Sequence, residues 1–142
     1  MPIRSLRSVV AAKKAPVMIA SDTTVAEAAR RMRDGNTGAA IVLEGSRLAG
    51  IFTERDALFR VLAVAKDPQA TPVSQVMTRD PQTIHPDQPF VEALRMMHEG
   101  RYRHLPVVED GRPLGMVSSR DALAPELLRL REDLDLLDAD RE

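Results

Sequence analysis

The sequence contains no cysteine and no tryptophan, and aromatic residues make up only 3% of its 142 residues. The absence of cysteine excludes disulfides, thiolate catalysis and zinc sites that use sulfur. The scarcity of aromatic side chains argues against a stacking platform for single-stranded nucleic acid. With 44% hydrophobic residues the chain is still typical of a globular protein, so its core must consist of aliphatic residues and methionine.

Long hydrophobic runs and an excess of one charge are also missing. No apolar run approaches the roughly 20 residues needed to cross a bilayer. The formal net charge is −1 with 29% charged residues, so the chain has no overall basic field for nucleic acid. We therefore expect a soluble, cytoplasmic protein that binds neither a membrane nor nucleic acid.

The most informative feature of the sequence is an internal repeat. Residues 50–56 read GIFTERD, and residues 115–121, 65 positions later, read GMVSSRD. At the same offset, and without a gap, residues 16–58 match residues 81–123. Such a match indicates a tandem duplication. Because units of about 60 residues are marginal on their own, we expect the two halves to share a core.

Both halves have the same predicted order of elements: an extended segment, a helix, two strands and a second helix that begins at the motif. The first helix is predicted from a capping box at Thr24 to Gly35 in one half, and from Pro89 in its first turn to Gly100 in the other. Both glycines are expected to end their helices, and Gly35 is expected to do so at a positive φ. The strands are predicted at residues 39–43, 48–52, 105–108 and 114–117, with turns between them.

These patterns divide the chain into five regions. They are a basic N-terminal lead at 1–15, a first repeat at 16–65, a linker at 66–72, a second repeat at 73–124 and an acidic, leucine-bearing helix at 125–142. The lead contains no acidic residue, a composition that transit peptides share, but we expect it to be part of the folded domain or a flexible lead. The leucine stripe of the last helix covers the core or contacts another chain.

The repeated pattern Gly-apolar-x-Thr/Ser-x-x-Asp, closing a strand-strand-helix unit, resembles the cystathionine-beta-synthase (CBS) domain pair. Residues 22–28 and 87–93, which share Asp-x-x-x-x-Glu-Ala, add to the resemblance, as does RHLPVV at residues 103–108, which is similar to the family's central strand. The resemblance covers about residues 16–124.

The resemblance implies an α/β fold of the α+β type. Two tandem CBS repeats, each with a small sheet flanked by helices, would pack as one pseudo-twofold globule. Such a pair, often called a Bateman module, is implied to be a regulatory unit that binds adenosine-containing ligands in clefts between the repeats. It is also implied to assemble as a flat homodimer.

The motif has the chemistry to hold a nucleotide. A strand-to-helix corner presents the free amides of the first helical turn to an anion. The hydroxyls of Thr53 and Ser118 can donate to a phosphate or sugar oxygen, and the carboxylates of Asp56 and Asp121 can accept from vicinal ribose hydroxyls. The alternative is that each Thr/Ser-x-x-Asp set only caps a helix, although one aspartate can do both.

Basic residues near the motif favour an anionic ligand. Arg55 and Arg120 stand in the first helical turn, where the helix dipole disfavours cations unless an anion is present. Arg103 and His104 precede the central strand of the second half, where the family often places phosphate contacts. The first half has only Gly38 there, followed by alanine, so the phosphate contacts are expected to be asymmetric. The alternative is a solvated rim at Arg103 and a packed strand edge at His104.

An adenine ring would need apolar walls. The candidates are aliphatic residues of the predicted extended segments, whose default role is the core: Val17, Ile19, Ile41, Ile84 and Val107.

These observations support two hypotheses. The first is a regulatory module that senses an adenine nucleotide (AMP, ADP or ATP) and passes its occupancy to an unknown partner protein. The second is a structural dimerisation adaptor that keeps the motif as helix caps. An enzyme is not expected, since no phosphate loop or catalytic set occurs. No cofactor or metal is expected to be required, because the three histidines include no i, i+4 pair.

Overall fold

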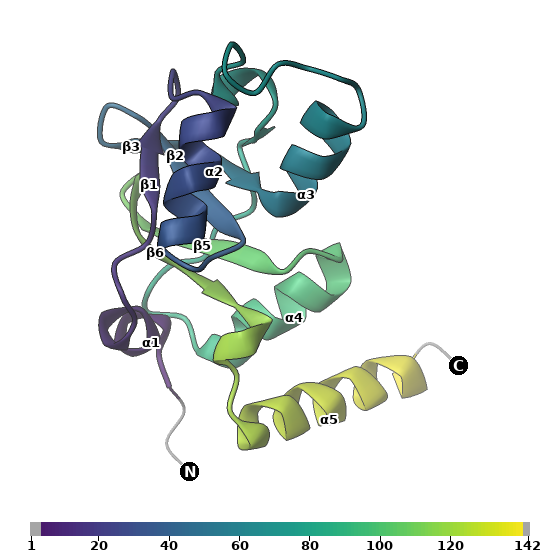
Figure 1. The fold of residues 1–142 in the computed structure, drawn as a ribbon. Helices are drawn as coiled ribbons and strands as arrows, with labels where there is room; N and C mark the ends of the chain where they lie inside the picture. The colour runs from purple at the N-terminus through teal and green to yellow at the C-terminus, as the bar shows by residue number, and fades with distance from the viewer. Residues whose placement is uncertain (1–3, 141–142) are drawn as a thin grey trace.

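The duplicated segments form two similar units, one above the other in Figure 1. The computed structural model describes residues 4–140. The first unit contains β1 (Met18–Ala20), α2 (Val25–Asp34), β2 (Ala39–Glu44), β3 (Arg47–Thr53), α3 (Glu54–Asp56) and the π-helix η1 (Ala57–Leu62). The second contains α4 (Phe90–Gly100), β5 (His104–Glu109), β6 (Arg112–Ser118) and the 3₁₀ turn η3 (Ser119–Asp121). The remaining elements are α1 (Leu6–Ala12), η2 (Val73–Gln75), β4 (Thr78–Arg79) and α5 (Ala124–Asp140).

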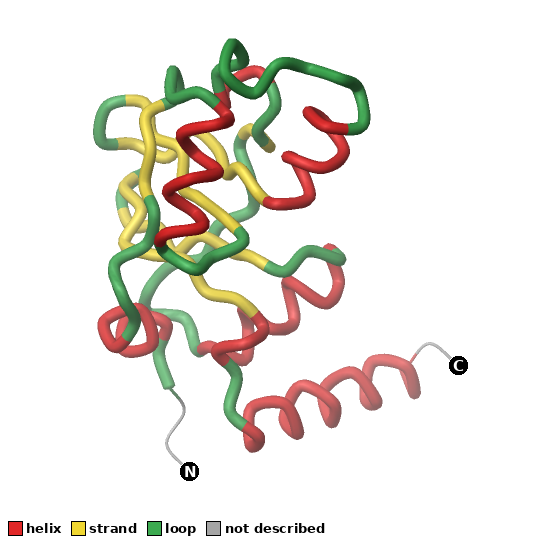
Figure 2. The backbone as a smooth tube through the Cα atoms, viewed as in Figure 1, coloured by secondary structure: helices red, strands yellow, loops and turns green. Residues whose placement is uncertain are grey.

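The pairing of the strands repeats at the offset found in the sequence. A four-stranded sheet has the order β1-β2-β3-β4, in which β1 and β2 are parallel and the other pairs are antiparallel. In it Ile19 pairs with Val42, and 65 residues later Ile84 forms a parallel bridge with Val107 beside the β5–β6 hairpin. The predicted α+β fold of two tandem repeats is therefore confirmed, and helices flank both sheets (Figure 2).

Helix termini agree with the sequence only in part. The Thr24 hydroxyl accepts from the Glu27 N–H at 3.2 Å, as predicted, but the Glu27 carboxylate pairs with Arg30 at 2.9 Å instead of completing the capping box. The predicted positive φ at Gly35 is wrong, because its φ is −83° and the left-handed residue is Asn36 at 50°. Gly35 instead permits close packing, since a Cβ there would lie 2.9 Å from a methyl group of Val17.

The corresponding helix of the second unit differs in the same way. Pro89 is its N-cap, with an extended ψ of 148°, and not a residue of the first turn. Gly100 is its last residue, and the positive φ of 58° falls at Arg101. In both units the left-handed residue therefore follows the glycine.

The second helix of the second unit is also different from the expectation. After the single 3₁₀ turn η3 the chain becomes extended at Ala122, and a separate helix, α5, begins at Ala124. The sequence suggests that Pro125 interrupts a helix, but this residue lies in the first turn of α5, where a fixed φ and a missing N–H are tolerated. The helix expected at 125–142 thus begins one residue earlier, and its last two residues lie outside the described part of the chain.

The cores of the two units are completed by segments from elsewhere in the chain. The core of the first unit includes Val73, Val76 and Met77, from the start of the second repeat. The core of the second unit includes Leu6 and Val9 of α1, from the basic lead. A third cluster joins the two sheets and contains Ala39, Ile41, Ile51 and Met116. The two units therefore share a core, as expected.

Residues 4–14 and residues 73–79 each cross over to pack on the other unit, and we call them the crossing segments. Matching backbone hydrogen bonds hold both in place. The N–H of Leu6 donates to Gln88 and that of Phe90 donates back to Arg4, at 3.0 and 2.9 Å. In the other unit the N–H of Val73 donates to Thr23 at 2.8 Å, and the Val25 N–H donates back to Thr71 at 2.9 Å. The N-terminal segment and the segment after the linker thus have equivalent positions (Figure 1).

The glycine that begins each motif is required where these segments pack on the sheets. A Cβ at Gly50 would lie 2.5 Å from the backbone oxygen of Thr78, and a Cβ at Gly115 would lie 2.5 Å from a methyl group of Val10. Both distances are shorter than van der Waals contact allows. The motif glycines therefore permit the crossing segments to pack directly on β3 and β6.

None of the helices between residues 4 and 140 combines the length and the apolar character that crossing a membrane requires.

Leucine-to-alanine substitutions test the contribution of α1. Leu6 is fully buried, so Leu6→Ala should lower the free energy of unfolding by about 2–5 kcal/mol. The matched control is Leu136→Ala in α5, because Leu136 is 67% exposed and its truncation should change stability by less than about 0.5 kcal/mol. Urea denaturation measures both. Equal effects of the two substitutions would contradict an essential role of α1 in the second core.

Candidate ligand-binding site

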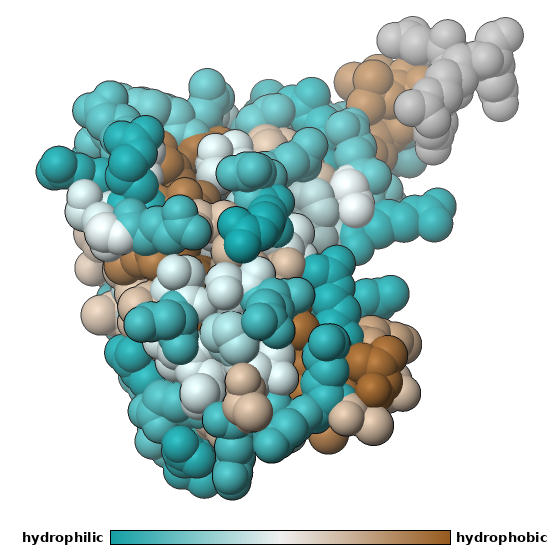
Figure 3. Space-filling view, turned by 90° about the horizontal axis from the view of Figure 1, so that it is seen from above, coloured by the Kyte–Doolittle hydropathy of each residue, from teal (hydrophilic) through white to brown (hydrophobic). Residues whose placement is uncertain are grey.

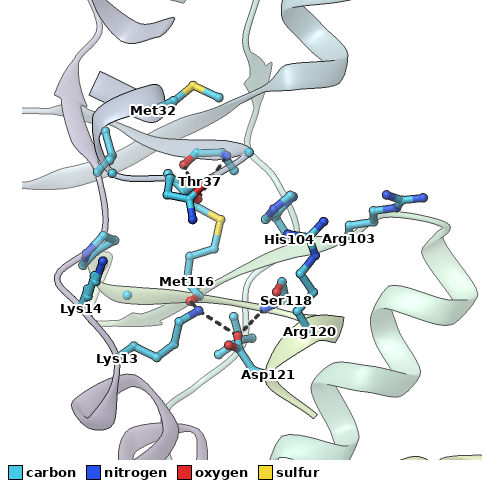
Figure 4. Close-up of a pocket in the computed structure, with 18 of the residues that line it drawn as sticks. Lys13, Lys14, Met32, Thr37, Arg103, His104, Met116, Ser118, Arg120 and Asp121 are labelled. Carbon is cyan, nitrogen blue, oxygen red and sulfur yellow. Dashed lines mark hydrogen bonds and ion pairs between the residues drawn. The ribbon is translucent and has the colours of Figure 1, made fainter. Parts of the chain in front are cut away.

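The larger cleft lies between the two units and has a volume of about 840 Å³. One wall is the segment from the end of α1 to β1, a second is the loop before β2, and the third is the β6–η3 corner (Figure 4). Its polar and charged lining residues are Lys13, Lys14, Arg33, Asn36, Thr37, Glu54, Arg103, His104, Ser118, Ser119, Arg120 and Asp121.

The β6–η3 corner presents a carboxylate with an available oxygen. Asp121 Oδ2 accepts from the Ser118 backbone N–H and from Lys13 Nζ, both at 2.8 Å. Lys13 also donates to the Met116 carbonyl at 2.9 Å. Asp121 Oδ1 receives no hydrogen bond from any described residue, and the side chain is 19% exposed. Asp121 therefore caps the turn with Oδ2, and Oδ1 has no hydrogen-bond donor among the described residues.

Strand pairing brings the basic residues of the second repeat to this corner. His104, the first residue of β5, lies opposite Ser118, the last residue of β6. Arg103 precedes β5 and Arg120 follows β6, so both line the same cleft. In Figure 4 these residues stand on one side of the cleft, whereas Lys13 and Lys14 stand on the other.

The smaller cleft, of about 420 Å³, contains the first copy of the motif. Here the Thr53 hydroxyl accepts from the Asp56 N–H at 3.1 Å, and Asp56 Oδ2 accepts from the Thr53 N–H at 3.0 Å, which forms a complete capping box. Asp56 Oδ1 lies 3.6 Å from Arg60 Nε, and the Asp56 side chain is only 8% exposed. Arg55 stacks on Phe59, with 4.8 Å from its guanidinium carbon to the ring centre. Each oxygen of Asp56 therefore faces a donor or a cation of the protein.

His104 lines both clefts. Burial lowers the pKa of its imidazole below the usual value, and the nearby cations Lys13, Arg103 and Arg120 lower it further, while Glu54 opposes them. A lowered pKa keeps the ring neutral at pH 7, so one ring nitrogen donates and the other accepts a hydrogen bond.

The Thr/Ser, Arg and Asp positions of the two motif copies line different clefts. Thr53, Arg55 and Asp56 line the smaller one, whereas Ser118, Arg120 and Asp121 line the larger one together with Arg103 and His104. Among the apolar candidates only Val17 lines a cleft. Ile19, Ile41, Ile84 and Val107 line neither cleft and are buried, since they lie on strands or bridges covered by the cores.

Several lining residues were not singled out from the sequence. Lys13, Lys14, Arg33 and Glu54 line the larger cleft, and the first two belong to the basic lead. The adjacent lysines are visible in the sequence, but their counterparts 65 residues later are Thr78 and Arg79. The repeat therefore gave no signal that would place them beside the second motif.

One group of potential metal ligands was also not expected. The ligand atoms of His85, Asp87 and Glu109 lie within 4.8 Å of one another. Arg7 already bridges this group, because its guanidinium lies 3.1 Å from Asp87 and 2.9 Å from Glu109. The group is thus an exposed ion-pair network that fixes α1 to the second unit.

The two similar units, with a charged cleft between them, define the chain as a tandem-repeat module. A sequence profile of the CBS domain matches residues 6–63 and 73–125. The chain therefore belongs to the CBS domain family.

This chain is similar both to known protein sequences and to solved structures that are named as CBS domain proteins. CBS domain-containing protein CBSX3, mitochondrial, of Arabidopsis thaliana is 35% identical over 124 residues, which is 84% of this chain and 60% of that protein. The chain thus spans less than two thirds of the length of this relative. It spans 19% of the length of CBS domain-containing protein CBSCBSPB1, also of Arabidopsis thaliana.

Two solved structures of similar fold hold adenosine compounds. CBS domain protein PAE2072 from Pyrobaculum aerophilum, complexed with AMP, has a TM-score of 0.81 and 25% identity, covering 91% of this chain and 99% of that one. The CBS domain pair of protein MJ0100, in complex with 5′-methylthioadenosine and S-adenosyl-L-methionine, has a TM-score of 0.73 and 26% identity, covering 83% and 95%.

The lowered pKa of His104 predicts a specific loss of stability in acid. The unfolded chain binds a proton near pH 6.5, whereas the native chain does so only at lower pH, so stability falls as the pH decreases below about 6.5. His104→Gln removes this contribution. Urea unfolding of both proteins at pH 7.5 and 5.5 should show a smaller acid loss for the variant. Equal losses, or an NMR-measured pKa for His104 at or above its usual value, would contradict the prediction.

Proposed function

We propose that this chain is a regulatory module that binds an adenine nucleotide, AMP, ADP or ATP, in the larger cleft. The observation that carries the proposal is Asp121, whose Oδ1 is available at the edge of a cleft lined by five cationic residues and only two carboxylates. The volume of about 840 Å³ suits a ligand of nucleotide size. The AMP-bound and S-adenosylmethionine-bound relatives support an adenosine ligand.

Each residue then has a chemical role. Asp121 Oδ1 accepts from the ribose hydroxyls, and the Ser118 hydroxyl donates to a sugar or phosphate oxygen. Arg120 and Arg103 neutralise the phosphate, while the neutral His104 donates a hydrogen bond to it. Val17 provides an apolar contact for the adenine ring. The free amides expected to face the phosphate have a smaller role, because η3 is a single turn.

The smaller cleft is a weaker site in this proposal. Thr53 and Asp56 cap each other there, and Arg60 neutralises the aspartate. A ribose would have to displace the arginine before it could bind to this carboxylate. The two clefts therefore differ in the carboxylate that would accept from a ribose, as well as in the phosphate contacts at Arg103 and His104.

Aspartate-to-asparagine substitutions test the site and distinguish a sensor from an adaptor. Asparagine can still accept from the Ser118 N–H, so Asp121→Asn preserves the turn but loses the charged acceptor. Isothermal titration with AMP, ADP, ATP and S-adenosylmethionine should show binding to the wild type, and about 10–100-fold weaker binding to this variant.

The matched control is Asp56→Asn at the equivalent position of the smaller cleft, which should retain the high-affinity site. Circular dichroism establishes that each variant is folded. No binding of any of the four ligands to folded wild-type protein would refute the sensor proposal and favour the dimerisation adaptor.

Exposed apolar side chains favour a homodimer, whose geometry would pass the ligand signal to a partner. The helix formed by α3 and η1 and the residues after it expose Leu58 (52%), Phe59 (55%), Leu62 (67%) and Val64 (57%). Hydrophobic atoms interrupt the hydrophilic surface at the right edge of Figure 3, on the side where α3 lies in Figure 1. A second copy would bury this surface, and a ligand would shift the dimer according to its affinity for each arrangement. A partner protein would then recognise the dimer geometry.

A charged substitution tests the proposed dimer surface. Sedimentation equilibrium should show a dimer for the wild type and a monomer for Leu62→Lys, because a buried unpaired ammonium is costly. Leu136→Lys in α5 is the matched control, since it places the same charge at a leucine of equal exposure and should leave the dimer intact. A monomeric wild type, or dimers of both variants, would contradict this surface.

A further inference from the structure

We propose that Lys13 and Lys14 make the larger cleft selective for adenosine di- and triphosphates over AMP and over adenosyl ligands without phosphate. The inference rests on the proposed function, because it names the ligand class of the same cleft. The two lysines lie in the crossing segment between α1 and β1, outside the duplicated residues 16–58 and 81–123.

The larger cleft concentrates positive charge that the chain as a whole lacks. Five cationic residues but only Glu54 and Asp121 among carboxylates line it, whereas the formal net charge of the protein is −1. Lys14, Arg103 and Arg120 form no ion pair within residues 4–140. Like charges that face one cleft repel one another, so a polyanion that enters it gains attraction from several cations at once.

The positions of the cations favour more than one phosphate. Arg103 and Arg120 lie on the β5–β6 side, and they suffice for the single phosphate of AMP. Lys13 and Lys14 lie across the cleft (Figure 4), so additional phosphates give a ligand the means to contact both groups. Lys13 is already next to the proposed ribose position, since its Nζ lies 2.8 Å from Asp121 Oδ2.

The smaller cleft provides an internal comparison. Its charged residues are Arg55 and Arg60 with Asp56 and Asp80, so cations and carboxylates are equal in number. Arg60 is committed to Asp56 and to the Met77 carbonyl at 2.9 Å. This cleft therefore has no excess charge for a polyphosphate, and the selectivity belongs to the larger cleft alone. A cationic sulfonium compound would be disfavoured in the larger cleft for the same electrostatic reason.

Isothermal titration of the full chain with adenosine, AMP, ADP, ATP and S-adenosylmethionine, without divalent cations and at two salt concentrations, tests the inference. Affinity should increase from adenosine to ATP, with ATP about tenfold or more tighter than AMP, which corresponds to about one partly solvated ion pair. The preference should decrease at higher salt. S-adenosylmethionine should bind more weakly than AMP.

Lys14→Gln is the main variant, because Lys14 is exposed and its replacement removes no ion pair of the described residues. It should weaken the binding of ATP about tenfold and leave the affinity for AMP nearly unchanged. Lys14→Arg should restore the preference for ATP. Lys66→Gln is the control, since Lys66 is also exposed but lines neither cleft.

The possible outcomes separate this inference from the proposed function. Equal affinities for AMP, ADP and ATP in the wild type would overturn the inference and leave the proposed function intact. An ATP preference that survives in Lys14→Gln and in Lys13→Gln would also overturn it, because the selectivity would then depend on the arginines. Failure of every ligand to bind to folded protein would refute the proposed function itself.

Discussion

The structure depends on the two crossing segments that complete the cores. The second unit buries Leu6 and Val9 from before the first repeat, and the first unit buries Val73 and Met77 from the start of the second. Each unit is small, and without the borrowed side chains it would lose part of an already limited apolar core. The two units therefore cannot separate without opening both cores, and the clefts between them keep a defined shape.

The same crossings explain the repeated motif more fully than helix capping does. Its glycine admits the crossing segment at β3 or β6, its Thr or Ser ends the strand, and its Asp caps the following turn. One short motif thus combines a packing requirement with a chemical one. The two corners differ because Arg60 engages the aspartate in one and Lys13 engages it in the other, leaving Asp121 Oδ1 available.

Local and repeated features were predictable from the sequence. The duplication predicted the equivalent strand registers, such as Ile19 with Val42 and Ile84 with Val107, because strand pairing is conserved between copies at the offset of 65. The Ser/Thr-x-x-Asp corners were predictable because they depend on residues only three positions apart. The left-handed conformations of Asn36 and Arg101 were not predictable. A glycine at a helix end usually indicates that the glycine itself has the positive φ, but here the next residue has it.

Long-range placement was not predictable in the same way. Leu6 and Val73 have equivalent positions but stand 67 residues apart, so the ungapped repeat does not align them. Nothing local to Leu6 shows that it packs on the second unit, and the location of Lys13 and Lys14 follows from that packing. Apolar candidates such as Ile41 could not be divided between cleft and core, because either environment requires the same aliphatic residue.

The position of His104 has a thermodynamic consequence for the two clefts. A single imidazole forms part of the wall of both, so a ligand that fixes its orientation or its proton in one cleft changes the surface offered to the other. Such coupling is reciprocal: the factor by which the first ligand alters the affinity of the second equals the factor in the opposite direction. If both clefts bind ligands as proposed, His104 is the one side chain through which the two unequal sites would communicate.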